Sequence, residues 1–177
     1  MLISDNLIDI TIGLSLKITG ENMGIEIERK FLVKDRKWKA ELSEHIIQGY
    51  LNSDKNRIVR VRIAGSRAWI TIKGLTTGTS RLEFEYEIPL EDARVLISIC
   101  EQPVLEKRRS IVIHRGIRWE VDEFLGENDG LVVAEVELRE PDQNLELPDW
   151  IGKEVTDDPR YFNSNLLTNP FSQWNLD

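Results

Sequence analysis

Hydrophobic and polar residues alternate along most of the chain from Gly24 onward, which is typical of β-strands whose two faces meet different surroundings. The stretch 25–33 shows the pattern first: Glu26, Glu28 and Lys30 share one face, and the apolar side chains fall mostly on the other. Comparable stretches are 46–52, 57–64, 67–73, 81–88, 104–114, 117–124 and 131–139. The pattern therefore predicts eight strands, most of them joined by short turns.

Helical spacing of apolar residues appears in three other stretches. Residues 35–44 include Trp38 at such a position, and Asp35 is suited to cap a helix there. Residues 90–101 carry a clear apolar stripe, and a further helix is predicted in the tail near 159–168. The first two helices would follow strands one and five, so each is expected to cover an apolar outer face of the sheet.

Charged residues of both signs fall on one parity of most strands. The basic members are Lys30, Arg60, Arg62, Lys73, Arg81, Lys107, Arg109 and Arg118. The acidic members are Glu26, Glu28, Glu83, Glu85, Glu87, Glu120, Asp122, Glu135 and Glu137. One such strand is usually a solvated face, but seven of them together, with helices over their apolar side, favour a sheet closed around the charges. We expect a mainly β (α+β) protein: a closed eight-stranded antiparallel barrel with helices packed outside.

A lumen with these charges must be wet or hold ions, because burying such a set dry would be prohibitive. Clustered arginine and lysine side chains suit an extended polyanion such as a polyphosphate. Acidic pairs two residues apart on one strand face suit hard divalent cations, which phosphates also bind. The pattern thus indicates a polyphosphate compound and divalent metal ions as occupants.

Composition narrows the class of protein. The 177 residues are 41% hydrophobic and 31% charged, as in a single globular domain, and the net charge of -8 argues against nucleic-acid binding through an overall field. Cys100 is the only cysteine, which excludes an intrachain disulfide and a cysteine-based zinc site. The sequence has no run of about 18 apolar residues to span a membrane, and residues 1–22 lack the pattern of a signal peptide. We expect a cytoplasmic protein.

Residues 1–22 read differently from the rest, and Met23 stands directly before the first strong strand. We therefore expect an N-terminal extension over 1–22, with Met23 as the natural start, and one domain over 23–177.

The charged pattern resembles that of a known family. Glu26-x-Glu28-x-Lys30 is similar to the ExExK signature of the CYTH domain, the triphosphate tunnel metalloenzymes, and nearly the whole of 24–168 follows their pattern. The later matches are Arg60-x-Arg62, Lys73, Arg81-x-Glu83-x-Glu85, Lys107-x-Arg109, Glu120-x-Asp122 and Glu135-x-Glu137. ExExK alone is a weak signal, but it is specific when the later pairs follow in order. The resemblance implies an eight-stranded tunnel, triphosphate substrates and dependence on Mg²⁺ or Mn²⁺.

Within the family, the chain resembles the short bacterial members that hydrolyse inorganic tripolyphosphate. Gln48-Gly49-Tyr50-Leu51 and the tail from Glu154 to Tyr161 are the stretches that carry this likeness. It implies that the tail helix plugs one mouth of the tunnel, and it permits a homodimer. No membrane or nucleic-acid partner is implied.

The resemblance also implies roles for individual residues. The phosphate oxygens would be held by Lys30, Arg60, Arg62, Lys73, Lys107 and Arg109. Lys30, Arg109 and Tyr50 are expected to act in catalysis, Tyr50 by positioning the water or the terminal phosphate. One metal ion would be held by Glu26, Glu28 and either Glu135 or Glu137. A second, near Glu83, Glu85, Glu120 or Asp122, would activate the attacking water.

Other functions stay open on the sequence alone. The family also contains thiamine triphosphatases, RNA triphosphatases and class IV adenylate cyclases, and the choice among substrates depends on the shape of the tunnel mouth. A non-catalytic barrel that binds polyphosphate or nucleotides would share the basic residues, but it could dispense with several carboxylates. A lipocalin-like carrier is disfavoured because its lumen is expected to be apolar.

Overall fold

The computed structural model describes residues 25–38, 40–75, 77 and 80–175. The expected extension over 1–22 lies outside these residues. The strands are β1 (Ile25–Val33), β2 (Leu42–Asn52), β3 (Arg57–Ala64), β4 (Arg67–Gly74), β5 (Ser80–Ile88), β6 (Glu101–His114), β7 (Ile117–Phe124), β8 (Val132–Glu137) and β9 (Ile151–Glu154). The helices are α1 (Leu90–Ser98) and the 3₁₀ helices η1 (Gly126–Asn128), η2 (Pro159–Tyr161), η3 (Asn165–Leu167) and η4 (Phe171–Gln173).

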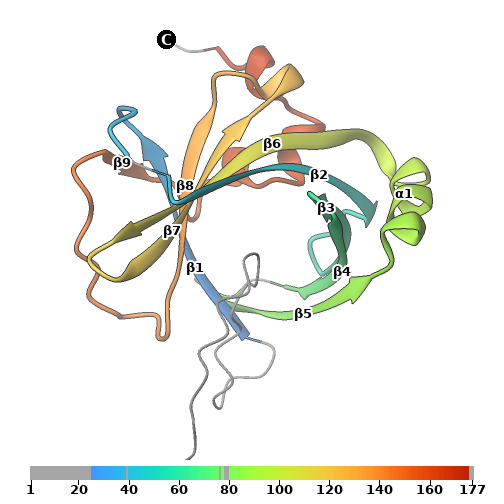
Figure 1. Ribbon diagram of the computed structural model, residues 1–177, viewed down its shortest axis with the longest axis horizontal. Coiled ribbons are helices and arrows are strands. Elements are labelled where there is room, and N and C mark those ends of the chain that lie inside the picture. The colour runs from blue at the N-terminus through green and yellow to red at the C-terminus, as the bar shows by residue number, and fades with distance from the viewer. Residues whose placement is uncertain (1–24, 39, 76, 78–79, 176–177) are drawn as a thin grey trace, which may run out of the picture.

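Eight antiparallel strands form a closed ring in the order β5-β4-β3-β2-β6-β7-β8-β1, and β1 closes it by pairing with β5 (Figure 1). Strand β1 does this by changing partners along its length: Glu26 lies opposite Arg81 of β5, and Lys30 lies opposite Glu135 of β8. The short strand β9 adds to β1 near the end of that strand. The predicted closed eight-stranded antiparallel barrel is therefore confirmed.

The apolar parity of the strands faces outward, and two separate layers cover part of it, while most apolar side chains of β5 stay exposed. Helix α1 covers β3 and β4, where Ala93 of the helix packs with Val61 and Ala68. On the other side Trp119 of β7 lies between Phe31 and Trp150, with ring centroids 5.8 Å away from each. The core thus lies outside the barrel wall, and the charged parity is left to face the lumen.

The predicted helix over 35–44 is wrong. The described residues before β2 form no helix, and β2 begins at Leu42, four residues before the predicted strand. The reason is tertiary: the long strand β6 pairs with the extra residues, placing Leu42 opposite Ile111 and Glu44 opposite Arg109. Asp35 accepts a hydrogen bond from the backbone N–H of Lys37, which makes a turn instead of a helix cap.

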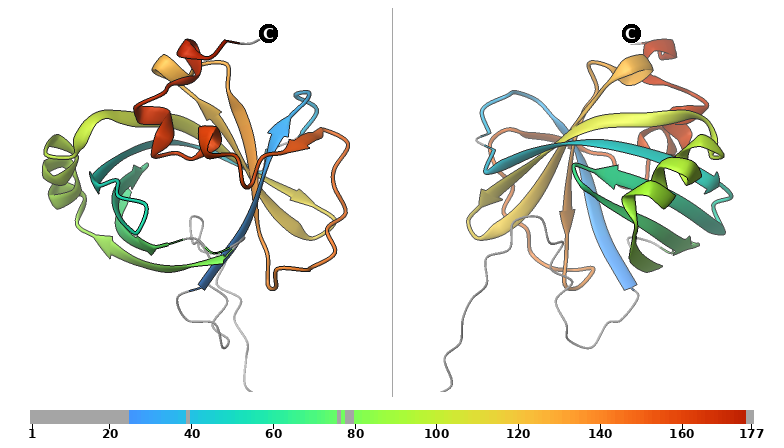
Figure 2. Two further views of the ribbon diagram at one scale, coloured as in Figure 1. Left: turned by 180° about the vertical axis from the view of Figure 1, so that it is seen from behind. Right: turned by 45° about the vertical axis from the view of Figure 1, so that its right-hand side comes forward.

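The tail is also less helical than predicted. In place of one helix near 159–168 it contains η2 and η3, two single turns of 3₁₀ helix. Asn165 contributes to this, because its side chain donates to the carbonyl of Pro159 and so competes with helical bonding. Seen from behind, these turns lie across one end of the barrel (Figure 2, left). The predicted plug is present as 3₁₀ turns.

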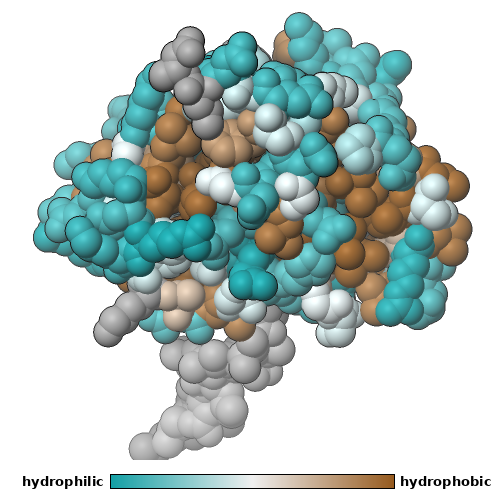
Figure 3. Space-filling model, turned by 90° about the horizontal axis from the view of Figure 1, so that it is seen from above, coloured by the Kyte–Doolittle hydropathy of each residue, from teal (hydrophilic) through white to brown (hydrophobic). Residues whose placement is uncertain are grey.

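The outer surface of the barrel carries both apolar and hydrophilic residues. Viewed from above, apolar groups gather among hydrophilic ones on the side of α1 (Figure 3), where Val95 and Ile99 are exposed. Over the residues that the structure describes, we find no helix with the length and apolar character that a membrane crossing requires.

Gly49 of β2 is needed for the contact between the barrel and the end of α1. A Cβ atom at this position would lie 2.8 Å from Cβ and 2.9 Å from Sγ of Cys100. We expect Gly49→Ala to lower the free energy of unfolding by about 1–3 kcal/mol, because the packed layer has no room for it. Thermal or urea unfolding measures this.

The control is Gly74→Ala, whose added Cβ would meet nothing nearer than 3.4 Å. Adding Cys100→Gly to Gly49→Ala removes both clashing atoms, so the cost of the alanine is expected to shrink in that background. Equal stability of Gly49→Ala and the wild type would contradict the packing.

Candidate functional site

Charged side chains from seven strands meet inside the barrel, and several are almost fully buried. The exposed fraction is 1% for Lys107 and 0% for Asp122. Lys30, Arg60, Lys73 and Glu135 are buried as well. Because an unpaired buried charge is very unfavourable, the first question is how these groups are paired.

One group of ion pairs joins β1, β6, β7 and β8. Arg109 reaches both Asp122, at 2.6 Å, and Glu135, at 2.9 Å. Asp122 also pairs with Lys107, and Glu135 also pairs with Lys30. These residues therefore form one continuous network, in which each carboxylate holds two cations.

A second group joins β1, β3, β4 and β5. Glu85 binds Arg62 at 3.0 Å and Arg60 at 3.3 Å, and Thr71 donates a hydrogen bond of 2.8 Å to the same carboxylate. Nearer β1, Lys73 lies 2.7 Å from Glu83, and both Lys73 and Arg81 pair with Glu26. The interior thus carries six of the predicted phosphate-binding cations, Lys30, Arg60, Arg62, Lys73, Lys107 and Arg109, together with Arg81.

Other predicted residues lie toward the rim. Glu120 pairs with Arg109 and with Arg118, whose side chain is 46% exposed. Glu137 is exposed and stands opposite Glu28 in the pairing of β1 with β8. Glu87 is exposed and pairs with Arg67. These positions are at the edge of the network and not at its centre.

The same inward parity becomes apolar at one end of the barrel. At this end, the inward position next to the charged ones is apolar on five strands. These side chains form a layer that we call the apolar floor: Leu32, Ile58, Leu105, Phe124 and Val133. Tyr161, Leu166 and Leu167 of the tail pack against it from outside the charged region. The floor and the tail therefore close the lumen at this end.

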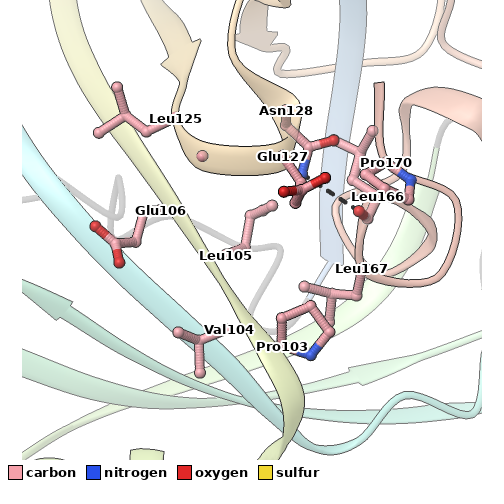
Figure 4. A pocket seen from close by; sticks show the side chains of 11 residues that line it. Pro103, Val104, Leu105, Glu106, Leu125, Glu127, Asn128, Leu166, Leu167 and Pro170 are labelled. Atoms are coloured by element: carbon pink, nitrogen blue, oxygen red, sulfur yellow. Dashed lines mark hydrogen bonds between the residues drawn. The ribbon is translucent and has the colours of Figure 1, made fainter. Parts of the chain in front are cut away.

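Asn128 holds the tail in place. Its side chain donates to the carbonyl of Leu166 at 3.3 Å and accepts from the backbone N–H of Phe171 at 2.8 Å. Beside it is a cavity of about 170 Å³ between the start of β6, η1 and the tail (Figure 4). This cavity is lined mainly by apolar residues and lies on the far side of the floor, so it is separate from the charged lumen.

Comparisons with known proteins agree with this geometry. The CYTH domain model matches residues 24–164. The chain belongs to the CYTH family. An inorganic triphosphatase of Acetivibrio thermocellus is 51% identical over 157 residues, covering 86% of this chain and 99% of the relative. One of Nitrosomonas europaea is 36% identical over 145 residues, covering 80% of this chain and 95% of the relative.

Among solved structures, a crystal structure of an inorganic triphosphatase superposes with a TM-score of 0.60 and 32% identity. It covers 80% of this chain and 93% of that chain. The resemblance predicted from the charged pattern is thus confirmed at the level of the family.

The carboxylates in this CYTH lumen differ in the direction in which their pKa is shifted. Burial raises the pKa of Glu26, but Lys73 and Arg81 outweigh it and hold that pKa well below its usual range. Burial, together with the nearby Glu135, raises the pKa of Glu28 to about 6. Glu28 is therefore only weakly compensated by cations, since among the described residues its ion pair is with Lys30 at 3.6 Å.

Among the cations, burial and the neighbouring Arg109 lower the pKa of Lys107 to about 8. Burial also lowers the pKa of Lys30, but Glu135 and Glu28 outweigh it and raise that pKa above its ordinary value. Both ammonium groups are thus mainly charged at neutral pH, as phosphate binding requires.

The carboxylates fit a metal ion that arrives with its substrate. Among the described residues no three acidic, histidine or cysteine side chains converge as a preformed site requires. They do approach in pairs: Glu26 and Glu83 share Lys73, and Glu28 and Glu135 share Lys30. Mg²⁺ is commonly bound by one or two carboxylates plus substrate phosphates. The paired carboxylates suit that mode, and the assignment of each metal ligand stays a prediction.

Tyr50 lies at the boundary between the charged lumen and the apolar floor. It is 3% exposed, and its hydroxyl accepts a 3.0 Å hydrogen bond from Nε2 of Gln48. Burial raises the pKa of Tyr50, so the phenol keeps its proton. Its place at the closed end agrees with the predicted contact to a terminal phosphate.

No place in the lumen was predicted from the sequence for the apolar floor, for Gln48 or for Thr71. The signal for the floor was available, since the charged parity ends in an apolar residue in Glu26-Glu28-Lys30-Leu32 and in Glu120-Asp122-Phe124. Gln48 and Thr71 are uncharged, so a search for charged pairs passes over them, although each shares the parity of lumen residues.

Because the pKa of Glu28 is raised, replacing this carboxylate by a neutral side chain is expected to stabilise the folded protein in a pH-dependent way. Ionising this carboxyl is harder in the folded state, where its pKa is about 6, than at its ordinary value of 4.5. Its contribution to stability is thus present below pH 4.5 and is lost as the pH rises through 6. In EDTA at pH 8, we expect Glu28→Gln to stabilise the protein by roughly 2 kcal/mol.

The measurement is the difference in Tm between variant and wild type from pH 8 down to pH 5, and it is expected to shrink along this series. Glu91→Gln, on the exposed side of α1, is the control. A difference that stays constant with pH would contradict the assignment.

Proposed function

We propose that this protein hydrolyses inorganic tripolyphosphate to diphosphate and phosphate inside the barrel, with a divalent metal ion, Mg²⁺ or Mn²⁺. The observation that carries the proposal is the lumen itself, where buried arginines and lysines alternate with buried carboxylates on the inward parity of seven strands. Two relatives that this chain matches over most of its length bear the name inorganic triphosphatase, which supports the same substrate.

The cations serve binding and catalysis. A triphosphate lying along the lumen would meet Arg60 and Arg62 from β3 and Lys107 and Arg109 from β6 along the same part of the wall, since both strands flank β2. These groups would bind the phosphate oxygens and offset the charge that develops on the leaving diphosphate. Because they stand on rigid strands, they are oriented before the substrate arrives.

The carboxylates Glu26, Glu28, Glu83 and Glu135 would hold the metal ion through the pairs described above. A divalent ion held there would offset phosphate charge and would lower the pKa of a water molecule. Lys30 and Lys73 would then turn from their carboxylates toward the phosphate oxygens. The exchange is nearly neutral in charge, which limits its cost.

The closed end favours a short, linear substrate. The side chains of the apolar floor have no hydrogen-bond donor, so the terminal phosphate would stop beside Tyr50 at the edge of the floor. A cyclase acting on ATP needs the ribose at the reacting phosphate and leaves no inorganic phosphate. Preference for thiamine triphosphate, or binding without catalysis, would each give a different result in a phosphate-release assay.

The test is phosphate release from tripolyphosphate, ATP and thiamine triphosphate, each with Mg²⁺, with Mn²⁺ and with EDTA. We expect metal-dependent release that is fastest with tripolyphosphate and is absent in EDTA. ATP consumed without phosphate release would identify cyclisation. Tight binding of tripolyphosphate with no release would leave only the binding role.

Arg62→Ala tests the lumen as the place of reaction. Arg62 binds Glu85 and has its guanidinium 5.0 Å from the ring centroid of Trp69. Removing this positioned donor is expected to lower kcat/KM for tripolyphosphate about 100-fold. Arg94→Ala, on the outer surface at α1, is the matched control and is expected to keep full activity. A fully active and folded Arg62→Ala variant would refute the site.

A further inference from the structure

Gln48 is a neutral polar residue buried among charged ones. It is 0% exposed, lies on the inward parity of β2, and stands opposite Arg62 of β3 and Leu105 of β6. It therefore occupies the boundary between the charged lumen and the apolar floor. A buried amide at such a place is expected to have each of its polar atoms paired.

Only one side of this amide is paired. Nε2 donates to the hydroxyl oxygen of Tyr50 at 3.0 Å, whereas Oε1 has no hydrogen-bond partner among the described residues. On the neighbouring strand β3, Nε of Arg62 and Nε of Arg60 are buried donors with no hydrogen-bond partner among the described residues. Because Arg62 stands opposite Gln48, an amide oxygen on that side complements these donors, whereas a flipped amide would set its N–H groups against them.

This orientation determines what Tyr50 can do. Its oxygen already accepts a hydrogen bond from Gln48, so its own proton is left to be donated to another group. An ionised triphosphate offers only acceptor oxygens, and its terminal phosphate would lie at the closed end beside Tyr50. A fixed phenol donor is complementary to that phosphate.

We propose that Gln48 is a positioning residue: by donating to the Tyr50 oxygen, it directs the Tyr50 O–H toward the terminal phosphate of the bound triphosphate. The proposal rests on the proposed function for the identity of the substrate. The hydrogen bond between the two side chains does not depend on turnover, so the two can fail separately.

A spectroscopic test addresses the hydrogen bond without turnover. The chain has three tyrosines, so protein labelled with ¹³C at tyrosine Cζ gives three NMR signals, and the signal missing in Tyr50→Phe belongs to Tyr50. We expect Gln48→Leu to shift this signal and leave the other two in place. We also expect tripolyphosphate in EDTA to shift the Tyr50 signal in the wild type and much less in Gln48→Leu. An unchanged Tyr50 signal in Gln48→Leu would overturn the proposal.

A kinetic test separates positioning from a structural role. Gln48→Leu and Tyr50→Phe are each expected to lower kcat for tripolyphosphate about tenfold with little change in KM, and the double variant is expected to lose no more than either single one. Losses that multiply in the double variant would overturn the proposal, because Gln48 would then act independently of Tyr50.

Gln48→Glu is the sharpest variant. It keeps the size, the polarity and an acceptor facing Arg62, but its carboxylate accepts a hydrogen bond from the Tyr50 O–H instead of donating one to the phenol oxygen. We expect a loss similar to that of Gln48→Leu, with the fold intact by circular dichroism. Full kcat in Gln48→Glu would show a merely structural role and overturn the proposal. Ser43→Ala, at an exposed position of the same strand, is the control and is expected to behave as the wild type.

Discussion

Pairing of buried charges is the constraint on which this structure depends. Each lumen cation sits within reach of a carboxylate, and Asp122 and Glu135 each bind more than one. A barrel with the same strands but only basic residues inside would leave uncompensated charge in its centre. The acidic residues thus have two uses: they allow the cations to be buried in the folded protein, and they are the ligands available to a metal ion.

The two uses explain why the outer layers carry most of the hydrophobic core. Packing against α1 and around Trp119 stabilises the barrel from outside, which leaves the interior free for polar chemistry. The apolar floor is the exception, and it gives the lumen a closed end. Depth in the barrel therefore corresponds to chemistry: charged groups line the part proposed to bind the substrate, and apolar groups close the end.

The closed barrel was predictable because strand alternation repeats from β1 to β8, and the sign of each charge could be read directly. The early start of β2 was not predictable, because the pairing of Leu42 and Glu44 with β6 is non-local and overrides the helical spacing seen in 35–44. β9 escaped notice because Ile151–Glu154 is four residues long and alternates weakly. Which cation faces which carboxylate depends on register across strands far apart in sequence, such as Arg109 with Glu135, and no local pattern contains that information.

The pairing of β1 with strands late in the sequence has a consequence for folding during synthesis. This strand is the first of the barrel to leave the ribosome, yet its partners β8 and β9 end more than a hundred residues later, at Glu137 and Glu154. Such distant contacts form slowly, since a long loop must close before they add any stability. Because β1 carries Glu26, Glu28 and Lys30, the groups proposed to bind metal and phosphate are all in place only when β1 has paired with β8. A nascent or partly folded chain therefore has no assembled site with which to sequester phosphate compounds or metal ions.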